Sequence, residues 1–275
     1  MSELTRDEIS FFKREGYLVK RGAMDPELTA RARDRMWAGI PPRFKRDDPD
    51  TWTGPFSEDE ECKESHSLRG GHMWKYREPG DEEWIIRMLI TNQPIWGWAE
   101  QLLGKGEVVD PFNSAPGQGA PPPEKIRGIY CRLPEGDIPK EAPVGHADAG
   151  FFHMGIVGII DHIPSHGGGF TVWPRSHRTL YHAFTTQYRH ERAENFDACI
   201  DQINLVTPVD CHGDAGDIVF WHHRLGHAAG HNRSRQIRQA VLYDFRKKDI
   251  EQTVDVPPHE DMWHDWSEEV RSAPD

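Results

Sequence analysis

The residues of this chain best suited to chemistry are two histidines and one carboxylate that lie far apart in the sequence. His146 and Asp148 belong to one His-Ala-Asp tripeptide, and His227 follows much later. Two imidazoles and a carboxylate are the ligand set that holds a non-haem Fe(II) ion by one face and leaves other positions open. Arg238, eleven residues after His227, offers a planar cation that can bind a carboxylate through two hydrogen bonds. The set suggests an oxygenase that depends on iron and 2-oxoglutarate.

Spacing supports part of this ligand set and leaves part of it open. Residues i and i+2 of a strand point to the same face, so His146 and Asp148 can reach one ion. Five histidines fall between positions 212 and 231. His222 and His223 are therefore alternatives to His227 that spacing alone does not exclude.

Arg238 lies in a run, residues 236–245, that is expected to form a strand. It would share one face of that strand with Ala240 and Leu242. An arginine that points inward among apolar residues needs an anionic partner, whereas on an edge strand it would be exposed.

The composition limits the classes of protein to which the chain can belong. Its 275 residues fit one domain, and 36% are hydrophobic, with ten Trp and twelve Phe, which suffices for a core. A net charge of −12 argues against non-specific nucleic-acid binding. No run approaches the roughly 20 apolar residues of a membrane helix. The N-terminus lacks the apolar region of a secretory signal, and the four cysteines form no CxxC pair, so reduced thiols in the cytoplasm are expected.

The expected elements fall into a helical N-terminal part, about residues 1–105, and a β-rich part. Capping residues, Gly and Pro mark the helix ends. The expected N-terminal elements are a helix capped by Thr5 and Glu8 and ended by Gly16, a strand at 17–19, a helix at 25–38, a surface loop at 40–60 and a helix at 82–103 interrupted at Pro94. After a Gly- and Pro-rich loop at 110–123, short apolar runs alternate with turn residues from about 125 to 246, which is typical of an antiparallel sandwich or barrel.

Four motifs follow one another along the chain. They are a helix followed by Gly16-Tyr17-Leu18-Val19, the pair His146 and Asp148, a turn with Gly168, Pro174, Ser176 and His177, and a run with Gly216, Asp217, Phe220, His227, Gly230, Asn232 and Ser234 before Arg238. In this order they resemble the phytanoyl-CoA dioxygenase family of Fe(II)/2-oxoglutarate oxygenases, which includes the ectoine hydroxylases, over about residues 5–20 and 125–246. This alignment selects His227 over its neighbouring histidines. The ordered combination is specific, although no single motif is.

The resemblance implies a mainly β fold with flanking helices, namely a double-stranded β-helix, or jelly roll, of the cupin type. The chain would be a single domain over 1–275, with its jelly-roll core at about 125–246 and an extension at 247–275 that packs as a short helix or tail. His146, Asp148 and His227 would hold Fe(II), and Arg238 would pair with the far carboxylate of 2-oxoglutarate. The implied reaction consumes O2, releases succinate and CO2, and by default hydroxylates a small-molecule substrate. Asp148 counts against a halogenase, which lacks that carboxylate.

Two positions depart from the family pattern. Ala229 stands where the family often has Ser or Thr, whose hydroxyl bonds the co-substrate, and Arg175 stands where it has a turn glycine. Tyr130 is expected as a further donor to the 2-oxoglutarate carboxylate, with Arg132 as a rival. Ala229 also gives weight to another class, a jelly-roll metal protein without O2 chemistry, such as a cupin-like isomerase or a non-catalytic sensor.

The sequence identifies neither the substrate nor the oligomeric state. Phe152, His153, Trp173 and Trp74 are candidates for the pocket wall, although bulky aromatic side chains at such positions more often belong to a core.

Residues 62–77 combine a Gly70-Gly71 pair with aromatic and cationic side chains. They are expected either as a lid over the site, mobile until substrate binds, or as a solvated loop. If they form a lid, their cations Arg69, Lys75 and Arg77 favour an anionic or zwitterionic substrate over a neutral one.

Overall fold

The computed structural model describes residues 3–112, 126–136 and 142–275, so most of the loop expected at 110–123 lies outside the described residues. The helices are α1 (Arg6–Glu15), α2 (Pro26–Gly39), α3 (Glu83–Ile86), α4 (Ile95–Leu103), α5 (Ser176–Tyr181), α6 (Phe196–Asn204), α7 (Ile250–Thr253) and α8 (Glu268–Ser272), with 3-10 turns η1 (Pro49–Thr51) and η2 (Glu78–Asp81) and a π-helical turn η3 (Arg87–Thr91). The strands are β1 (Tyr17–Lys20), β2 (Ser67–Gly70), β3 (Met73–Tyr76), β4 (Gly128–Arg132), β5 (Met154–Ile159), β6 (Phe170–Val172), β7 (Val209–Cys211), β8 (Ile218–His222), β9 (His227–Ala229) and β10 (Arg238–Phe245).

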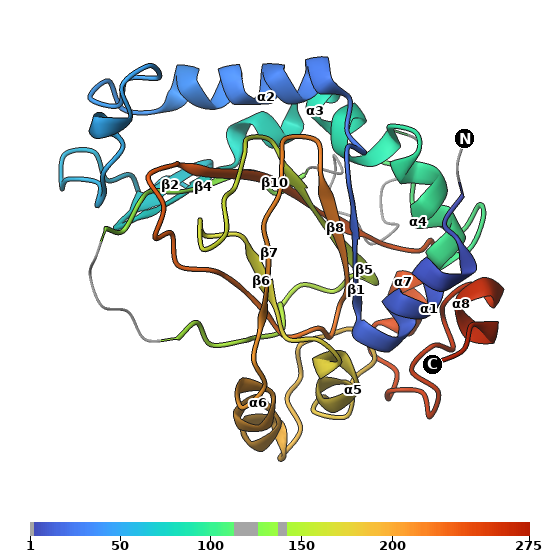
Figure 1. The fold of residues 1–275 in the computed structure, drawn as a ribbon. Coiled ribbons are helices and arrows are strands. Elements are labelled where there is room, and N and C mark those ends of the chain that lie inside the picture. The colour runs from blue at the N-terminus through green and yellow to red at the C-terminus, as the bar shows by residue number, and fades with distance from the viewer. Residues whose placement is uncertain (1–2, 113–125, 137–141) are drawn as a thin grey trace.

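Two antiparallel sheets form the body of the molecule (Figure 1). The larger has the order β1-β8-β5-β10-β4-β3-β2 and the smaller the order β7-β6-β9. A bridge between His146 and His227 adds the His-Ala-Asp segment beside β9. Neighbouring strands come from distant parts of the chain, as with β1 beside β8 and β5 beside β10. This connectivity is that of a double-stranded β-helix, so the predicted fold class is confirmed.

Successive side chains on the strands of the larger sheet point to opposite faces, so they pack into two separate cores. On β10, Val241 and Tyr243 pack into the core beneath the helices. Ala240 and Leu242 pack into the core between the two sheets. Arg238 shares this second face, as its spacing predicted, and therefore points between the sheets.

Helices α2, α3 and α4 cover the outer face of the larger sheet (Figure 1). The interruption expected at Pro94 is present, because α3 and η3 end before it and α4 begins after it. None of the helices in the described ranges combines the length and apolar character that a membrane crossing requires.

The N-terminal helix starts where its capping residues predicted. The Thr5 hydroxyl accepts from the Glu8 amide at 3.2 Å, and the Glu8 carboxylate accepts from the Thr5 amide at 2.9 Å. Gly16 ends the helix with a φ of +83°, which favours glycine. Asp25 likewise caps α2 by accepting two backbone amides.

The expected surface-turn change at Arg175 is confirmed. Its φ of +67° explains why a glycine suits this position in the family. The exposed guanidinium pairs with Glu15 at 2.9 Å, which ties the turn to the end of α1.

Residues 62–77 differ from the expected lid or solvated loop. They contain the hairpin β2–β3, whose turn includes Gly71 at a φ of +54°, and β3 pairs with β4 within the larger sheet. Backbone hydrogen bonds thus fix the second half of the segment in the barrel wall.

The C-terminal extension packs against the N-terminal helix and ends in a short helix, as expected. The Phe12 ring lies 6.2 Å from Trp263 and 5.3 Å from Trp266, measured between ring centroids. Lys13 donates to the backbone carbonyl of Ala273 at 2.8 Å, so the two ends of the described chain stabilise each other.

Candidate metal centre

The smaller sheet and the segment beside it bring His146, Asp148 and His227 together. Nε2 of His227 lies 3.6 Å from Oδ2 of Asp148, and Nε2 of His146 lies 3.9 Å from Oδ1. One ligand atom from each residue lies within 4.8 Å of the others. An ion about 2.1 Å from each of three donors needs donors roughly 3–4 Å apart. The three residues therefore fit a metal ion after small side-chain adjustments.

The hydrogen bonds of the histidines favour His227 as a ligand. Its Nδ1 lies 2.9 Å from the carbonyl oxygen of Leu225, so Nδ1 carries the proton and Nε2 presents a free lone pair towards Asp148. The ring of His222 instead stacks on Trp266, and that of His223 packs on Tyr188. Neither alternative belongs to the cluster around Asp148.

Asp148 is held by an arginine that the sequence did not single out. Nη2 of Arg127 donates to Oδ2 of Asp148 at 2.6 Å and to Asp244 at 2.7 Å. Arg127 precedes β4, and only the pairing of β4 with β10 places it beside Asp244. No sequence pattern could have revealed this contact, because the three residues lie on separate segments.

The electrostatics of the cluster keep its ligand atoms in metal-binding form. Burial alone would raise the pKa of Asp148, but His227 and Arg127 hold that pKa well below its usual range. Partial loss of solvent, and then the neighbouring His227 ring, lower the pKa of His146 below its usual range, although 57% of the side chain is exposed. A carboxylate and a neutral imidazole are the forms that coordinate metals.

A cavity of about 760 Å³ opens beside the three residues and lies between the two sheets. Its wall includes Arg238 from β10, Tyr130 from β4 and Ala229 from β9. The structure thus brings together the three residues that the sequence associated with a co-substrate. Lys75 and His231 also line this cavity, although the sequence had not singled them out as its wall.

Arg238 is a buried cation that lacks a carboxylate partner among the described residues. Its side chain is almost wholly covered, with 4% of the residue exposed. Nη1 donates to the carbonyl of Tyr130 at 3.1 Å, and Nε has no hydrogen-bond partner. Burial lowers the pKa of Arg238 to about 10, so the group remains charged at neutral pH. A charged, incompletely bonded guanidinium in a cavity wall fits an anionic ligand.

The rival to Tyr130 already has a partner. Arg132 pairs with the buried carboxylate of Glu135 at 2.5 Å, and Glu135 also lies 3.0 Å from Nδ1 of His231. The guanidinium of Arg132 is therefore less available to a ligand than that of Arg238.

The four aromatic candidates for the pocket wall do not line this cavity. Trp74 alternates with Lys75 on β3, so it faces the helical core while Lys75 faces the cavity. Phe152 packs edge-on against Trp221 in the core between the sheets. His153 is fully buried beside Tyr188, and Trp173 is buried against Gly145.

A second cavity, of about 670 Å³, adjoins the first and shares Lys75, Arg127, Tyr130 and Asp148 with it. Arg77 also lines this second cavity. Neither Lys75 nor Arg77 has a carboxylate partner among the described residues. Arg69, the third cation of the segment, does not line either cavity.

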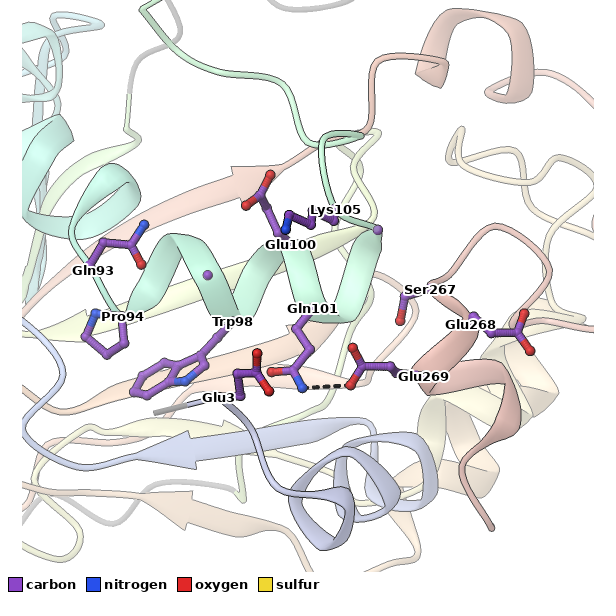
Figure 2. Close-up of a pocket in the computed structure, with 12 residues that line it drawn as sticks. Glu3, Gln93, Pro94, Trp98, Glu100, Gln101, Lys105, Ser267, Glu268 and Glu269 are labelled. Carbon is purple, nitrogen blue, oxygen red and sulfur yellow. Dashed lines mark hydrogen bonds between the residues drawn. The ribbon is translucent and has the colours of Figure 1, made fainter. Parts of the chain in front are cut away.

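A third pocket, of about 580 Å³, lies elsewhere, along α4 and between the two ends of the chain (Figure 2). Figure 2 shows Trp98 and Gln101 of α4 beside Glu3 and Glu269, and Gln101 donates to Glu269 at 2.7 Å. The described lining contains no histidine or cysteine, so this pocket offers no comparable metal ligand set.

Comparison with known proteins supports the family that the motifs indicated. The model of the phytanoyl-CoA dioxygenase family matches residues 135–240, a stretch that contains His146, Asp148, His227 and Arg238. The predicted family resemblance is thereby confirmed. A search of curated proteins found no match to this sequence.

Several solved structures share the fold. One is the non-haem α-ketoglutarate-dependent carbocyclase SnoK from nogalamycin biosynthesis, with a TM-score of 0.54, 16% identity, and coverage of 94% of this chain and 95% of that chain. Another is EctD from S. alaskensis with bound Fe, with a TM-score of 0.55, 15% identity and coverage of 92% and 80%. A structure of EctD with 2-oxoglutarate and 5-hydroxyectoine has a TM-score of 0.53, 15% identity and coverage of 88% and 76%. At these identities the likeness shows a shared fold.

Proposed function

We propose that this protein is an Fe(II)- and 2-oxoglutarate-dependent oxygenase that hydroxylates a small-molecule metabolite. The observation that carries the proposal is that Arg238, a buried cation without a carboxylate partner among the described residues, lines the cavity on which His146, Asp148 and His227 converge. An acidic co-substrate would supply the anionic partner that this cation lacks. The family match and the shared fold support the same assignment.

Each residue of the cavity has a distinct role in the proposal. His146, Asp148 and His227 would bind the iron, which when bound supplies the activation of O2 coupled to decarboxylation of 2-oxoglutarate. The Leu225 carbonyl keeps Nε2 of His227 unprotonated. Arg127 holds the Asp148 carboxylate in place without binding the metal itself.

The co-substrate would lie along the wall formed by β4, β9 and β10. Arg238 would pair with its far carboxylate, and Tyr130 would donate a further hydrogen bond to it. Ala229 has no hydroxyl to donate to this carboxylate. Tyr130 and Arg238 would therefore bind it without the additional hydrogen bond that a Ser or Thr at this position provides in the family.

The primary substrate would enter through the second cavity. Lys75 and Arg77 alternate along and just beyond β3, and both line that cavity next to Asp148. The same cavity is also lined by the carboxylates of Glu78, Asp81, Asp148 and Asp244. Groups of both signs in one cavity favour a zwitterionic substrate, whose anionic group would contact Lys75 and Arg77. Substrate would contact the hairpin β2–β3 there, which retains part of the role expected for a lid.

The decisive experiment is anaerobic addition of 2-oxoglutarate to the Fe(II)-loaded protein. The proposal expects a weak visible charge-transfer band in the wild type and in His222→Ala, and no band in His227→Ala. Addition of O2 and candidate zwitterionic metabolites should then stimulate succinate formation. A protein that binds Fe(II) but gives neither the band nor succinate would belong instead to the class of jelly-roll metal proteins without O2 chemistry.

A further inference from the structure

A second group of two histidines and one carboxylate lies in the C-terminal extension, separate from the triad and its cavities. Ligand atoms of His259, His264 and Asp265 lie within 4.8 Å of one another. Nε2 of His259 is 3.6 Å from Oδ1 of Asp265. The two imidazole rings have centroids 4.1 Å apart and an interplanar angle of 30°.

The carboxylate of this group is buried and held in one orientation. Asp265 is 8% exposed, and its Oδ2 accepts from the Tyr188 hydroxyl at 2.8 Å and from Nε2 of Gln187 at 3.2 Å. Both donors are neutral. The other oxygen, Oδ1, faces the His259 ring, and no Lys or Arg among the described residues pairs with this carboxylate. The nearby Lys247 ammonium donates instead to the backbone carbonyl of Asp265, at 2.9 Å. A buried carboxylate without a directly paired cation gains from a positive charge bound at its free oxygen.

Backbone hydrogen bonds position both histidines. The amide of His259 donates to Oε1 of Gln187 at 3.0 Å, and the amide of His264 donates to the carbonyl of Asp261 at 3.0 Å. A tight turn at 261–264 thus brings His264 back over His259. Gln187 contacts both the carboxylate and the histidine backbone, and so pre-organises the group.

We propose that His259, His264 and Asp265 bind a divalent transition-metal ion of borderline softness, such as Zn²⁺. Two imidazoles and one carboxylate are suitable ligands for zinc, which accepts water as its fourth ligand. None of the three residues lines either cavity near the triad, so the group is separate from the candidate co-substrate site. The ion would join residues 259, 264 and 265 of the C-terminal extension, and Asp265 in turn accepts hydrogen bonds from Gln187 and Tyr188.

The test uses a protein whose triad is removed, so that its outcome is independent of the proposed oxygenase function. Apo protein with His146→Ala and His227→Ala is titrated with Zn²⁺ in competition with a chromophoric chelator. One equivalent should bind. Adding His264→Ala should weaken that binding by more than about 100-fold, because loss of even an outer-shell partner of a metal ligand costs about 10–100-fold.

The matched control is His162→Ala in the same background. His162 is an exposed histidine whose Nδ1 lies 2.6 Å from Asp214, but it belongs to no group of three metal-ligating residues in the described chain. It should leave zinc binding unchanged. Co²⁺ in place of Zn²⁺ provides a second readout, since its visible absorption reports imidazole coordination directly. Zinc binding that is absent, or equally tight with and without His264, would overturn the proposal.

Discussion

The two groups of two histidines and one carboxylate have nearly the same dimensions and opposite surroundings. Nε2 to carboxylate distances are 3.6 Å for His227 with Asp148 and 3.6 Å for His259 with Asp265. The first group lies on and beside strands and opens into a cavity of about 760 Å³. The second lies on a turn of the C-terminal extension and adjoins none of the cavities near the triad. Ligand identity therefore does not separate a candidate reaction centre from a candidate structural site.

The hydrogen-bond donors to the carboxylate also differ between the two groups. Asp148 accepts a charged hydrogen bond from Arg127, whereas Asp265 accepts neutral bonds from Tyr188 and Gln187. A charged partner holds the carboxylate whether or not metal is bound, which suits a site that must admit and release ligands. The Asp265 carboxylate has neutral hydrogen-bond donors on one oxygen and the His259 ring near the other, so a bound ion would supply its directly paired positive charge, which suits a structural site.

The largest effect is expected when one histidine ligand is removed from each group in turn. His227→Ala should abolish Fe(II)- and 2-oxoglutarate-dependent succinate formation, because only two protein ligands remain. His264→Ala, the corresponding change in the second group, should leave succinate formation at the wild-type level. Succinate assays with both variants, with folding checked by circular dichroism, measure this. Full activity of His227→Ala would remove the triad from the proposal.

The next largest effect concerns Arg238, the cation proposed to pair with the far carboxylate of 2-oxoglutarate. Arg238→Ala should raise the KM for 2-oxoglutarate by roughly 30-fold or more, since truncating one partner of a buried charged pair costs about 2–5 kcal/mol. The KM for the primary substrate should change far less. Arg69→Ala is the control, because Arg69 lines neither cavity near the triad. An unchanged KM for 2-oxoglutarate would place the co-substrate elsewhere.

Arg127 tests whether the charged support of Asp148 matters. Arg127→Leu should weaken Fe(II) affinity by about 10–100-fold, as loss of an outer-shell partner does. Tyr188→Phe, which removes a neutral donor from Asp265, should leave Fe(II) affinity at the triad unchanged. Equal Fe(II) affinity in Arg127→Leu and wild type, measured by anaerobic titration, would make the contact with Asp148 merely structural.

Acid should loosen the C-terminal extension, because a buried histidine lies beneath it. His177 packs against Trp263 at 5.7 Å, and burial lowers its pKa to about 3 although the ring donates to the Lys13 carbonyl. Between pH 6.5 and 3 the unfolded chain binds a proton that the folded chain does not, so stability falls as pH falls. The loss at pH 5.5 is about 1.4 kcal/mol from this group. Melting temperatures at pH 7.5 and 5.5 should differ less in His177→Gln.

The smallest effect concerns the residue that departs from the family. Ala229→Ser should tighten 2-oxoglutarate by about 1 kcal/mol, the net value of one hydrogen bond, because Ala229 lines the cavity beside Arg238. Titration of the Fe(II) protein with 2-oxoglutarate measures the change. Marked weakening would show that the wall is built around alanine.

Much of the triad and its strands was predictable because the relevant signals are local. The i and i+2 spacing of His146 and Asp148 and the alternation around Arg238 follow from strand geometry alone. The capping box at Thr5 and the glycine stop at Gly16 are equally local, and both are present. The choice of His227 needed the order of several motifs, because its neighbouring histidines have the same chemistry.

The prediction that Trp74 lines the pocket depended on the face of the strand that its side chain occupies, and it was wrong. Trp74 and Lys75 are adjacent in sequence, and the sequence proposed the aromatic residue for the pocket wall. Pairing of β3 with β4 fixes which of the two faces the cavity, and it is Lys75. A shift of one residue in this register would have reversed the result.

The sequence by itself determined the kinds of ligand, the β-rich core and the position of the buried arginine on its strand. These depend on residue type and on a backbone geometry that repeats every two residues. Tertiary structure alone decided that Arg127 supports Asp148, that Lys75 and Arg77 line the second cavity, and that His259, His264 and Asp265 form a second group. Such contacts join segments whose separation along the chain has no fixed period. They arise only when the packing of both sheets and the extension brings those segments together.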